Sequence, residues 1–158
     1  MNDVTLRPNS LPWPPIVYLT AIAVSVLLNV FSPLPWFGQP LSGILFVLGW
    51  LMIAAFVALN MSAIRAMRRA GTTVRPDRGT DHLVVDGPFS FTRNPLYVAG
   101  TMLVLAIGLV LGIVWFLLLA PLAAFTVQKL AIEREERHLQ ARFGEAYREY
   151  AGRVRRWI

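Results

Sequence analysis

Residues 94–128 read NPLYVAGTMLVLAIGLVLGIVWFLLLAPLAAFTVQ and contain no Asp, Glu, Lys or Arg. Residues 8–64 are also free of charge, so every charged side chain lies before them, in residues 65–93, or from Lys129 onward. A soluble domain needs charged side chains over its whole surface, whereas membrane spans are long and apolar. The pattern therefore predicts an all-α integral membrane protein, with residues 1–158 forming a single domain.

The charge-free lengths allow about four membrane helices of about 20 residues each. We predict the first at Pro15–Phe31 and the second at Leu41–Ile64, because prolines and a glycine mark a turn between them. Leu96–Ile132 is too long for one span and barely long enough for two. It is therefore predicted to form a tight hairpin of short or tilted helices that turns near Gly108–Gly112.

The distribution of charge predicts an orientation. The two apolar turns lack Arg and Lys, whereas residues 65–93 and the C-terminal tail are rich in Arg. By the positive-inside rule, both termini and the long linker are expected to be cytoplasmic. The net charge of +6 is explained by this topology better than by nucleic-acid binding. Gly71–Gly79, within the linker, reads as an irregular loop.

A metal centre is not expected, because the chain has no cysteine and only two histidines. We expect both of these, His82 and His138, to lie at the surface or in loops and to tolerate alanine.

The third predicted helix begins abruptly. Asn94 suits the N-cap and Pro95 suits the first helical position, since proline lacks the N–H group that would be unpaired there. The free N–H groups of the first turn, with Arg93 beside them and Tyr97 one turn on, are a natural receptor for a carboxylate or phosphate. The alternative is a simply capped helix, with Arg93 reaching lipid phosphates and Tyr97 anchored at the interface.

A second polar cluster follows the last apolar stretch. Glu133, Glu135 and Glu136 lie at a membrane boundary where the rest of the chain is basic, which would suit binding of a cation or of ribose hydroxyls. The alternative is a solvated helix with i,i+4 pairs such as Lys129–Glu133. Apolar residues then recur at helical spacing and predict an amphipathic helix able to cover the site, slightly interrupted at Gly144. These residues are Leu139, Phe143, Tyr147 and Tyr150.

Together the two clusters resemble the isoprenylcysteine carboxyl methyltransferase and phospholipid methyltransferase superfamily of membrane enzymes. Residues 87–100, GPFSFTRNPLYVAG, match the family form Gly-Pro-Tyr-x-x-x-Arg-His-Pro-x-Tyr-x-x-Gly, except that Asn94 replaces the histidine. Residues 135–139, EERHL, and 143–150, FGEAYREY, match the family's Glu-Glu pair, leucine and Phe-Gly-x-x-Tyr-x-x-Tyr. The resemblance covers about residues 83–154, which would form the cofactor-binding half.

This resemblance implies methyl transfer from S-adenosylmethionine to a small or lipophilic carboxylate, thiol or amine that enters from the bilayer. It also implies a multi-pass protein of the bacterial inner membrane. The implied catalytic residues are Arg93, Asn94 and Glu136. The implied cofactor-binding residues are Arg93, Asn94, Pro95, Tyr97, Gly100, Glu135, Glu136 and Tyr147. Since asparagine cannot exchange a proton near neutral pH, a mechanism that needs an imidazole at position 94 is in doubt.

Two other classes remain open on sequence alone. Membrane sterol reductases share a similar Arg-His-Pro-x-Tyr element but use NADPH, and four helices are few for that group. A non-enzymatic four-helix protein, such as a small transporter, would be expected to carry an ionisable residue within its spans, and this chain has none at the membrane midplane. Binding of S-adenosylmethionine, of NADPH or of neither distinguishes the three classes.

Overall fold

The computed structural model describes residues 11–71 and 82–158, and these residues form helices joined by short connections. The order is α1 (Trp13–Phe31), α2 (Leu41–Arg69), η2 (Gly87–Ser90), α3 (Pro95–Leu111), α4 (Val114–Val127), η3 (Gln128–Ile132), α5 (Glu133–Phe143) and α6 (Glu145–Arg153). Most of the predicted loop at Gly71–Gly79 lies outside the described residues.

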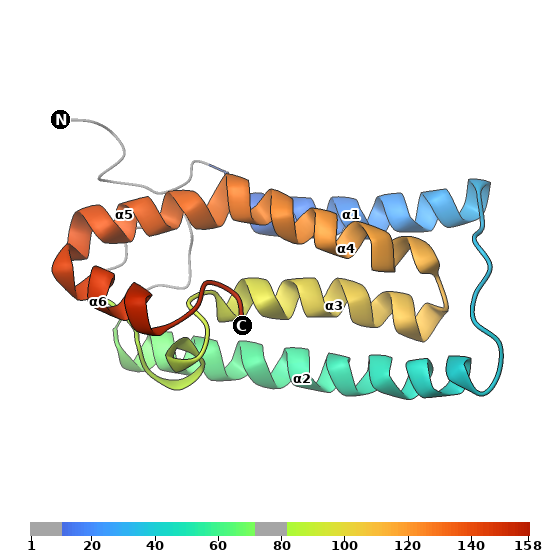
Figure 1. The fold of residues 1–158 in the computed structure, drawn as a ribbon, viewed down its shortest axis with the longest axis horizontal. Helices are drawn as coiled ribbons and strands as arrows, with labels where there is room; N and C mark the ends of the chain where they lie inside the picture. Colours follow the sequence, from blue (N-terminus) through green and yellow to red (C-terminus); the bar gives the residue numbers. More distant parts are fainter. Residues whose placement is uncertain (1–10, 72–81) are drawn as a thin grey trace.

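The long helices run side by side in an elongated bundle (Figure 1). α2 packs on α3, α3 on α4, and α4 on α1, so the order across the bundle differs from the order in the chain. Among the described residues, α1, α2 and the continuous helix Val114–Phe143 are long and apolar enough to cross a membrane. The chain is an all-α membrane protein, as predicted, although α2 extends five residues beyond the predicted end at Ile64.

The predicted hairpin is present between α3 and α4. α3 has 17 residues and is about 25 Å long, slightly shorter than a hydrocarbon core of about 30 Å. It ends at Gly112, whose φ of 69° is the left-handed conformation that glycine adopts readily at a helix C-terminus. Gly108 allows the two helices to meet closely, because a Cβ there would overlap the Cβ of Phe116. The hairpin therefore depends on glycines at the predicted turn.

The other end of the bundle carries the polar segments. The helix that begins as α4 extends past its last apolar turn as η3 and α5, and the chain reverses at Gly144 into α6 (Figure 1). The predicted amphipathic helix is therefore divided in two at Gly144, which has φ 54° and ψ −118°. After α6 the chain returns toward the start of α3, where it ends (Figure 1).

Candidate functional site

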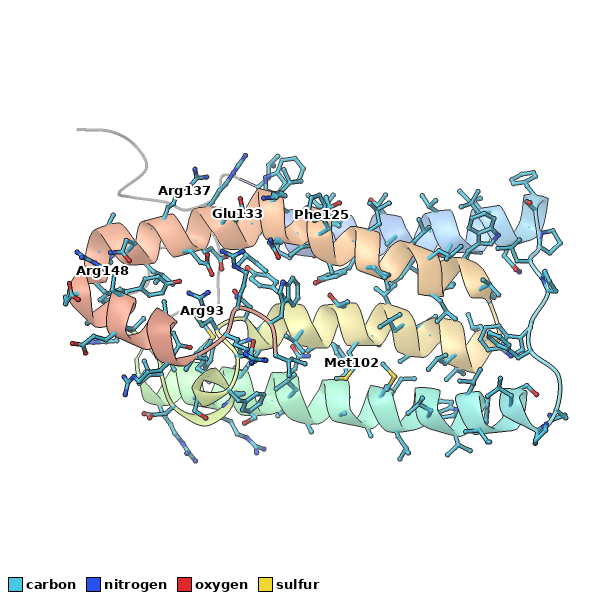
Figure 2. All side chains as sticks on the ribbon, viewed as in Figure 1. Arg93, Met102, Phe125, Glu133, Arg137 and Arg148 are labelled. Atoms are coloured by element: carbon cyan, nitrogen blue, oxygen red, sulfur yellow. The ribbon has the colours of Figure 1, made fainter. Side chains whose placement is uncertain are left out.

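The two sequence clusters meet where α3 begins and α5 follows the π-helical turn η3. Arg93 lies in the space between α5 and the start of α3, whereas Arg137 projects from the outer side of α5 (Figure 2). The η3 segment, Gln128–Ile132, is one π-helical turn, and such turns are frequent at functional sites. One extra residue rotates all following side chains by about 100°, so the turn sets which face of α5 points at α3.

Glu136 is held by two arginines. Its Oε1 lies 3.2 Å from Arg93 Nη2 and accepts a 3.0 Å hydrogen bond from Arg156 Nε, and its Oε2 accepts a 2.6 Å bond from Arg156 Nη2. The side chains of Arg93 and Glu136 are each 16% exposed and that of Arg156 is 33% exposed. The hydrogen bonds to Glu136 raise the pKa of the Arg156 guanidinium. Three charges thus meet in a poorly hydrated place, with a net charge of +1.

A second contact joins α3 to α5. The Tyr97 hydroxyl donates a 2.6 Å hydrogen bond to Glu135 Oε1. Glu135 lies in α5, the charged end of the continuous helix Val114–Phe143, beyond the apolar residues of that helix. Burial raises the pKa of its carboxyl to about 7, the hydrogen bond from Tyr97 opposes this rise, and the charge of Glu136 adds to it. Carboxyl groups with raised pKa values are found both at functional sites and in buried structural networks, and this one is bonded to the residue that lies one turn after Arg93.

The start of α3 differs in one respect from the sequence prediction. Asn94 occupies the N-cap position, but its side chain makes no capping hydrogen bond. Its Nδ2 instead donates a 2.9 Å bond to the backbone oxygen of Arg156, and Thr92 Oγ1 donates a 3.2 Å bond to the same oxygen. The Arg93 backbone N–H donates to the oxygen of Arg155 at 2.9 Å. The C-terminal tail is thereby bonded directly to the residues that precede α3.

The tail, Val154–Ile158, was not recognised as part of the site from the sequence. Its Trp157 Nε1 donates a 2.8 Å hydrogen bond to Gln128 Oε1. The Trp157 ring packs against the buried cluster of Val127, Ala131 and Ile132. In sequence, an arginine pair followed by tryptophan is typical of the basic residues that set membrane orientation and of an aromatic anchor at the interface. No local signal therefore identified the tail as part of the site.

α6 contributes two buried tyrosines near the site. Tyr147 and Tyr150 are each 4% exposed, and the Tyr150 hydroxyl donates a 2.7 Å bond to the oxygen of Phe89. Burial raises the pKa of Tyr147 to about 12, although the nearby guanidinium of Arg93 opposes this rise. The Tyr147 hydroxyl and Arg93 Nε are buried, and neither has a hydrogen-bond partner among the described residues. One N–H of the Arg93 guanidinium and the nearby Tyr147 hydroxyl are thus the two donors that could bind a ligand here.

The remaining predicted residues lie at other contacts. Pro95 is buried in the first turn of α3. Gly100 faces α1, and a Cβ there would lie 2.5 Å from Tyr18 Cε2. Tyr18 in turn donates to the oxygen of Tyr97 at 2.8 Å and lies 3.0 Å from Thr101 Oγ1. The structure therefore brings Arg93, Asn94, Tyr97, Glu135, Glu136 and Tyr147 together at one end of the bundle, and it sets Gly100 against α1.

Two further predictions have clear outcomes. His138 is only 2% exposed on α5, so the prediction of a surface position was wrong for this histidine, whereas His82 is exposed as predicted. The neighbours of His138 in sequence are charged, and its burial follows from the packing of the folded chain. Lys129 and Glu133 form the predicted i,i+4 pair at 2.6 Å.

Comparison with known protein families identifies the family of this chain. The model of a family described as phospholipid methyltransferase matches residues 44–146, well over half of the chain. The matched region contains the two segments that carry the sequence resemblance, except for residues 147–150. No curated protein and no solved structure matches the chain.

Proposed function

Since the chain belongs to the phospholipid methyltransferase family, we propose that it transfers a methyl group from S-adenosylmethionine to a small or lipophilic acceptor. The membership makes the chain a membrane methyltransferase, and the cofactor and acceptor are the parts that we propose. When bound, S-adenosylmethionine supplies a methyl group activated by its sulfonium. The protein's own side chains would bind it, orient it and exclude water.

The observation that carries this proposal is a pair of donors without hydrogen-bond partners among the described residues, one just before α3 and one on α6. These donors are the Arg93 Nε–H and the Tyr147 hydroxyl, both buried. Arg93 itself belongs to the cluster with Glu136 and Arg156, whose net charge is +1. The N-terminus of α3 adds positive potential there. Buried donors without partners are costly, so their presence favours a site completed by an acceptor-rich anionic group. The carboxylate of the methionine part fits this donor set.

Glu135 supplies the complementary group. Its carboxyl has accepted one hydrogen bond from Tyr97 and retains further lone pairs. We assign it to the ribose hydroxyls or to the α-ammonium of the same ligand, since either donor would stabilise the carboxylate form. Glu136, in contrast, already binds two arginines, and its proposed role is to hold them in place.

The acceptor is proposed to reach the site from the bilayer as a carboxylate, thiol or amine. The apolar outer faces of the helices, such as Ile44, Val47 and Leu51 of α2, are exposed and suit contact with lipid. Transfer from a sulfonium to such a nucleophile needs mainly correct positioning in a desolvated place. With arginine concentrated at the site end of the bundle, we propose that this end and both termini are cytoplasmic, in the inner membrane of a bacterium.

The test is binding of S-adenosylhomocysteine to the detergent-purified protein by calorimetry, with NADPH as the parallel ligand. We expect saturable binding of S-adenosylhomocysteine near one per chain and no binding of NADPH. Binding of NADPH alone would favour a reductase-like enzyme and would overturn the proposal. Binding of neither ligand to protein that is folded and monodisperse would overturn the assignment of the cofactor.

A further inference from the structure

Arg156 follows both family motifs in sequence and belongs to neither, but in the fold it contacts both of them. Its guanidinium spans both oxygens of Glu136, through Nε at 3.0 Å and Nη2 at 2.6 Å. Its backbone oxygen accepts hydrogen bonds from Asn94 and Thr92, which flank Arg93. One residue of the tail is therefore bonded to α5 through its side chain and to the start of α3 through its backbone.

The way in which Glu136 pairs with the two arginines decides which N–H groups of Arg93 remain available to a ligand. A carboxylate and a guanidinium prefer a two-pronged pairing with two parallel hydrogen bonds. Here Arg156 takes that pairing, and Arg93 contacts the carboxylate only through Nη2, at 3.2 Å. Arg93 Nε is buried and has no hydrogen-bond partner in residues 11–71 and 82–158. If Arg156 were absent, Glu136 would be free to take the two-pronged pairing with Arg93, and the donors proposed to bind the ligand carboxylate would be lost.

We propose that Arg156 is a positioning residue that keeps Arg93 available for the carboxylate of the ligand. It does so by occupying Glu136 in the favoured two-pronged geometry. The proposal rests on the proposed function, because it concerns the amino-acid end of the same ligand. Arg156 thus determines affinity for that end and has little effect on the nucleoside end.

The C-terminal tail is fixed to the rest of the site by several contacts. Trp157 packs on the buried cluster of Val127, Ala131 and Ile132 and is hydrogen-bonded to Gln128. A segment that opened to admit the ligand would have fewer such contacts. The Arg93 N–H bonds the oxygen of Arg155, which adds a backbone contact between the tail and the start of α3. These contacts hold Arg156 in one position, as a positioning role requires.

The experiment compares two ligands that differ at the amino-acid end. S-adenosylhomocysteine carries the α-amino-acid group, and 5′-methylthioadenosine has the same nucleoside thioether without it. Arg156→Ala is expected to weaken binding of S-adenosylhomocysteine by about tenfold to a hundredfold, as for loss of one charge-assisted contact. Binding of 5′-methylthioadenosine is expected to change by less than about twofold, since that ligand makes no use of Arg93.

Arg153→Ala is the matched control, because this arginine is exposed at the end of α6 and its loss changes the net charge equally. It should leave both affinities unchanged. Arg156→Lys keeps the charge but not the two-pronged geometry, so it should give a smaller loss, again confined to S-adenosylhomocysteine. It also serves as the test variant if Arg156→Ala does not yield folded protein.

The possible results separate the two proposals. An equal loss of affinity for both ligands in Arg156→Ala and Arg156→Lys would mean that Arg156 only maintains the fold, and would overturn the positioning role. Unchanged or tighter binding of S-adenosylhomocysteine would overturn it as well. If the wild-type protein binds neither ligand, the proposed function fails, and the role of Arg156 fails with it.

Discussion

The Tyr97 hydroxyl donates a 2.6 Å hydrogen bond to Glu135 Oε1, so a side chain in the first turns of α3 is joined to α5. Burial raises the pKa of the Glu135 carboxyl to about 7, while the hydrogen bond from Tyr97 limits the rise. Near neutral pH the group is therefore divided between its protonated and ionised forms, and a ligand that needs one form shifts this balance.

Affinity for S-adenosylhomocysteine is expected to rise with pH through this range. The raised pKa means that Glu135 is largely protonated below pH 7, whereas ribose hydroxyls or an ammonium favour the carboxylate. Binding at low pH must therefore remove a proton, so affinity should fall by about tenfold between pH 8 and pH 6. Calorimetric titrations at several pH values measure this slope. Glu135→Gln cannot ionise, so it should bind more weakly and without the slope; a slope that survives this change would assign the titration to another group.

Arg93→Ala and Glu136→Gln test the cluster at the start of α3. Arg93→Ala removes the proposed ligand contact, and Glu136→Gln releases both arginines from a shared carboxylate. Each should abolish measurable binding of S-adenosylhomocysteine while the protein remains folded in detergent. Arg137→Ala is the control, because this arginine is exposed on the outer side of α5 (Figure 2). Wild-type affinity in both Arg93→Ala and Glu136→Gln would show that the site lies elsewhere.

The helices and their turns could be predicted because a membrane span is a property of local composition. A long stretch without charge is stable as a helix within the bilayer. The turn was also predicted from local sequence, since Gly112 ends α3 within the predicted range. The resemblance predicted that residues 93–97 lie close to residues 135–136, and in the structure Tyr97 contacts Glu135 and Arg93 contacts Glu136. Arg156 could not be predicted, since it reaches Glu136 from 20 positions away, and one arginine of a basic tail resembles the next. Three-dimensional packing alone decides which of them is paired.

His138→Ala should destabilise the protein, contrary to what its charged neighbours in sequence suggest. The side chain is 2% exposed, so alanine leaves a cavity within the packing of α5. A loss of about 2 kcal/mol is expected, seen as a lower midpoint of thermal unfolding in detergent. His82→Ala is the natural comparison, because His82 is exposed and its replacement should have no measurable effect. Equal midpoints for the two variants would contradict the burial of His138.

Gly100→Ala tests whether this glycine serves packing or the ligand. A Cβ at Gly100 would lie 2.5 Å from the Tyr18 ring, which bonds the backbone oxygen of Tyr97. The added methyl group should therefore cost about 1–3 kcal/mol of stability through strain between α1 and α3. Gly152→Ala is the control, since no atom of the described residues would lie within 4 Å of a Cβ there and alanine favours the helix. Weaker ligand binding in Gly100→Ala at unchanged stability would instead support the cofactor contact predicted from the sequence.

Asn94 stands where the family motif has histidine, and the structure shows one bond that this side chain makes. Its Nδ2 donates to the oxygen of Arg156, a role that needs a donor and no exchangeable proton. At pH 7.5 a neutral imidazole also has an N–H donor, so Asn94→His should retain wild-type affinity for S-adenosylhomocysteine within about twofold. Asn94→Ala removes one neutral hydrogen bond and should weaken binding by about fivefold, with Thr92 still bonded to the same oxygen. Calorimetry on both variants checks this order of affinities. A histidine variant as weak as the alanine variant would mean that the amide acts through its shape or its oxygen, and not through the donor that holds Arg156.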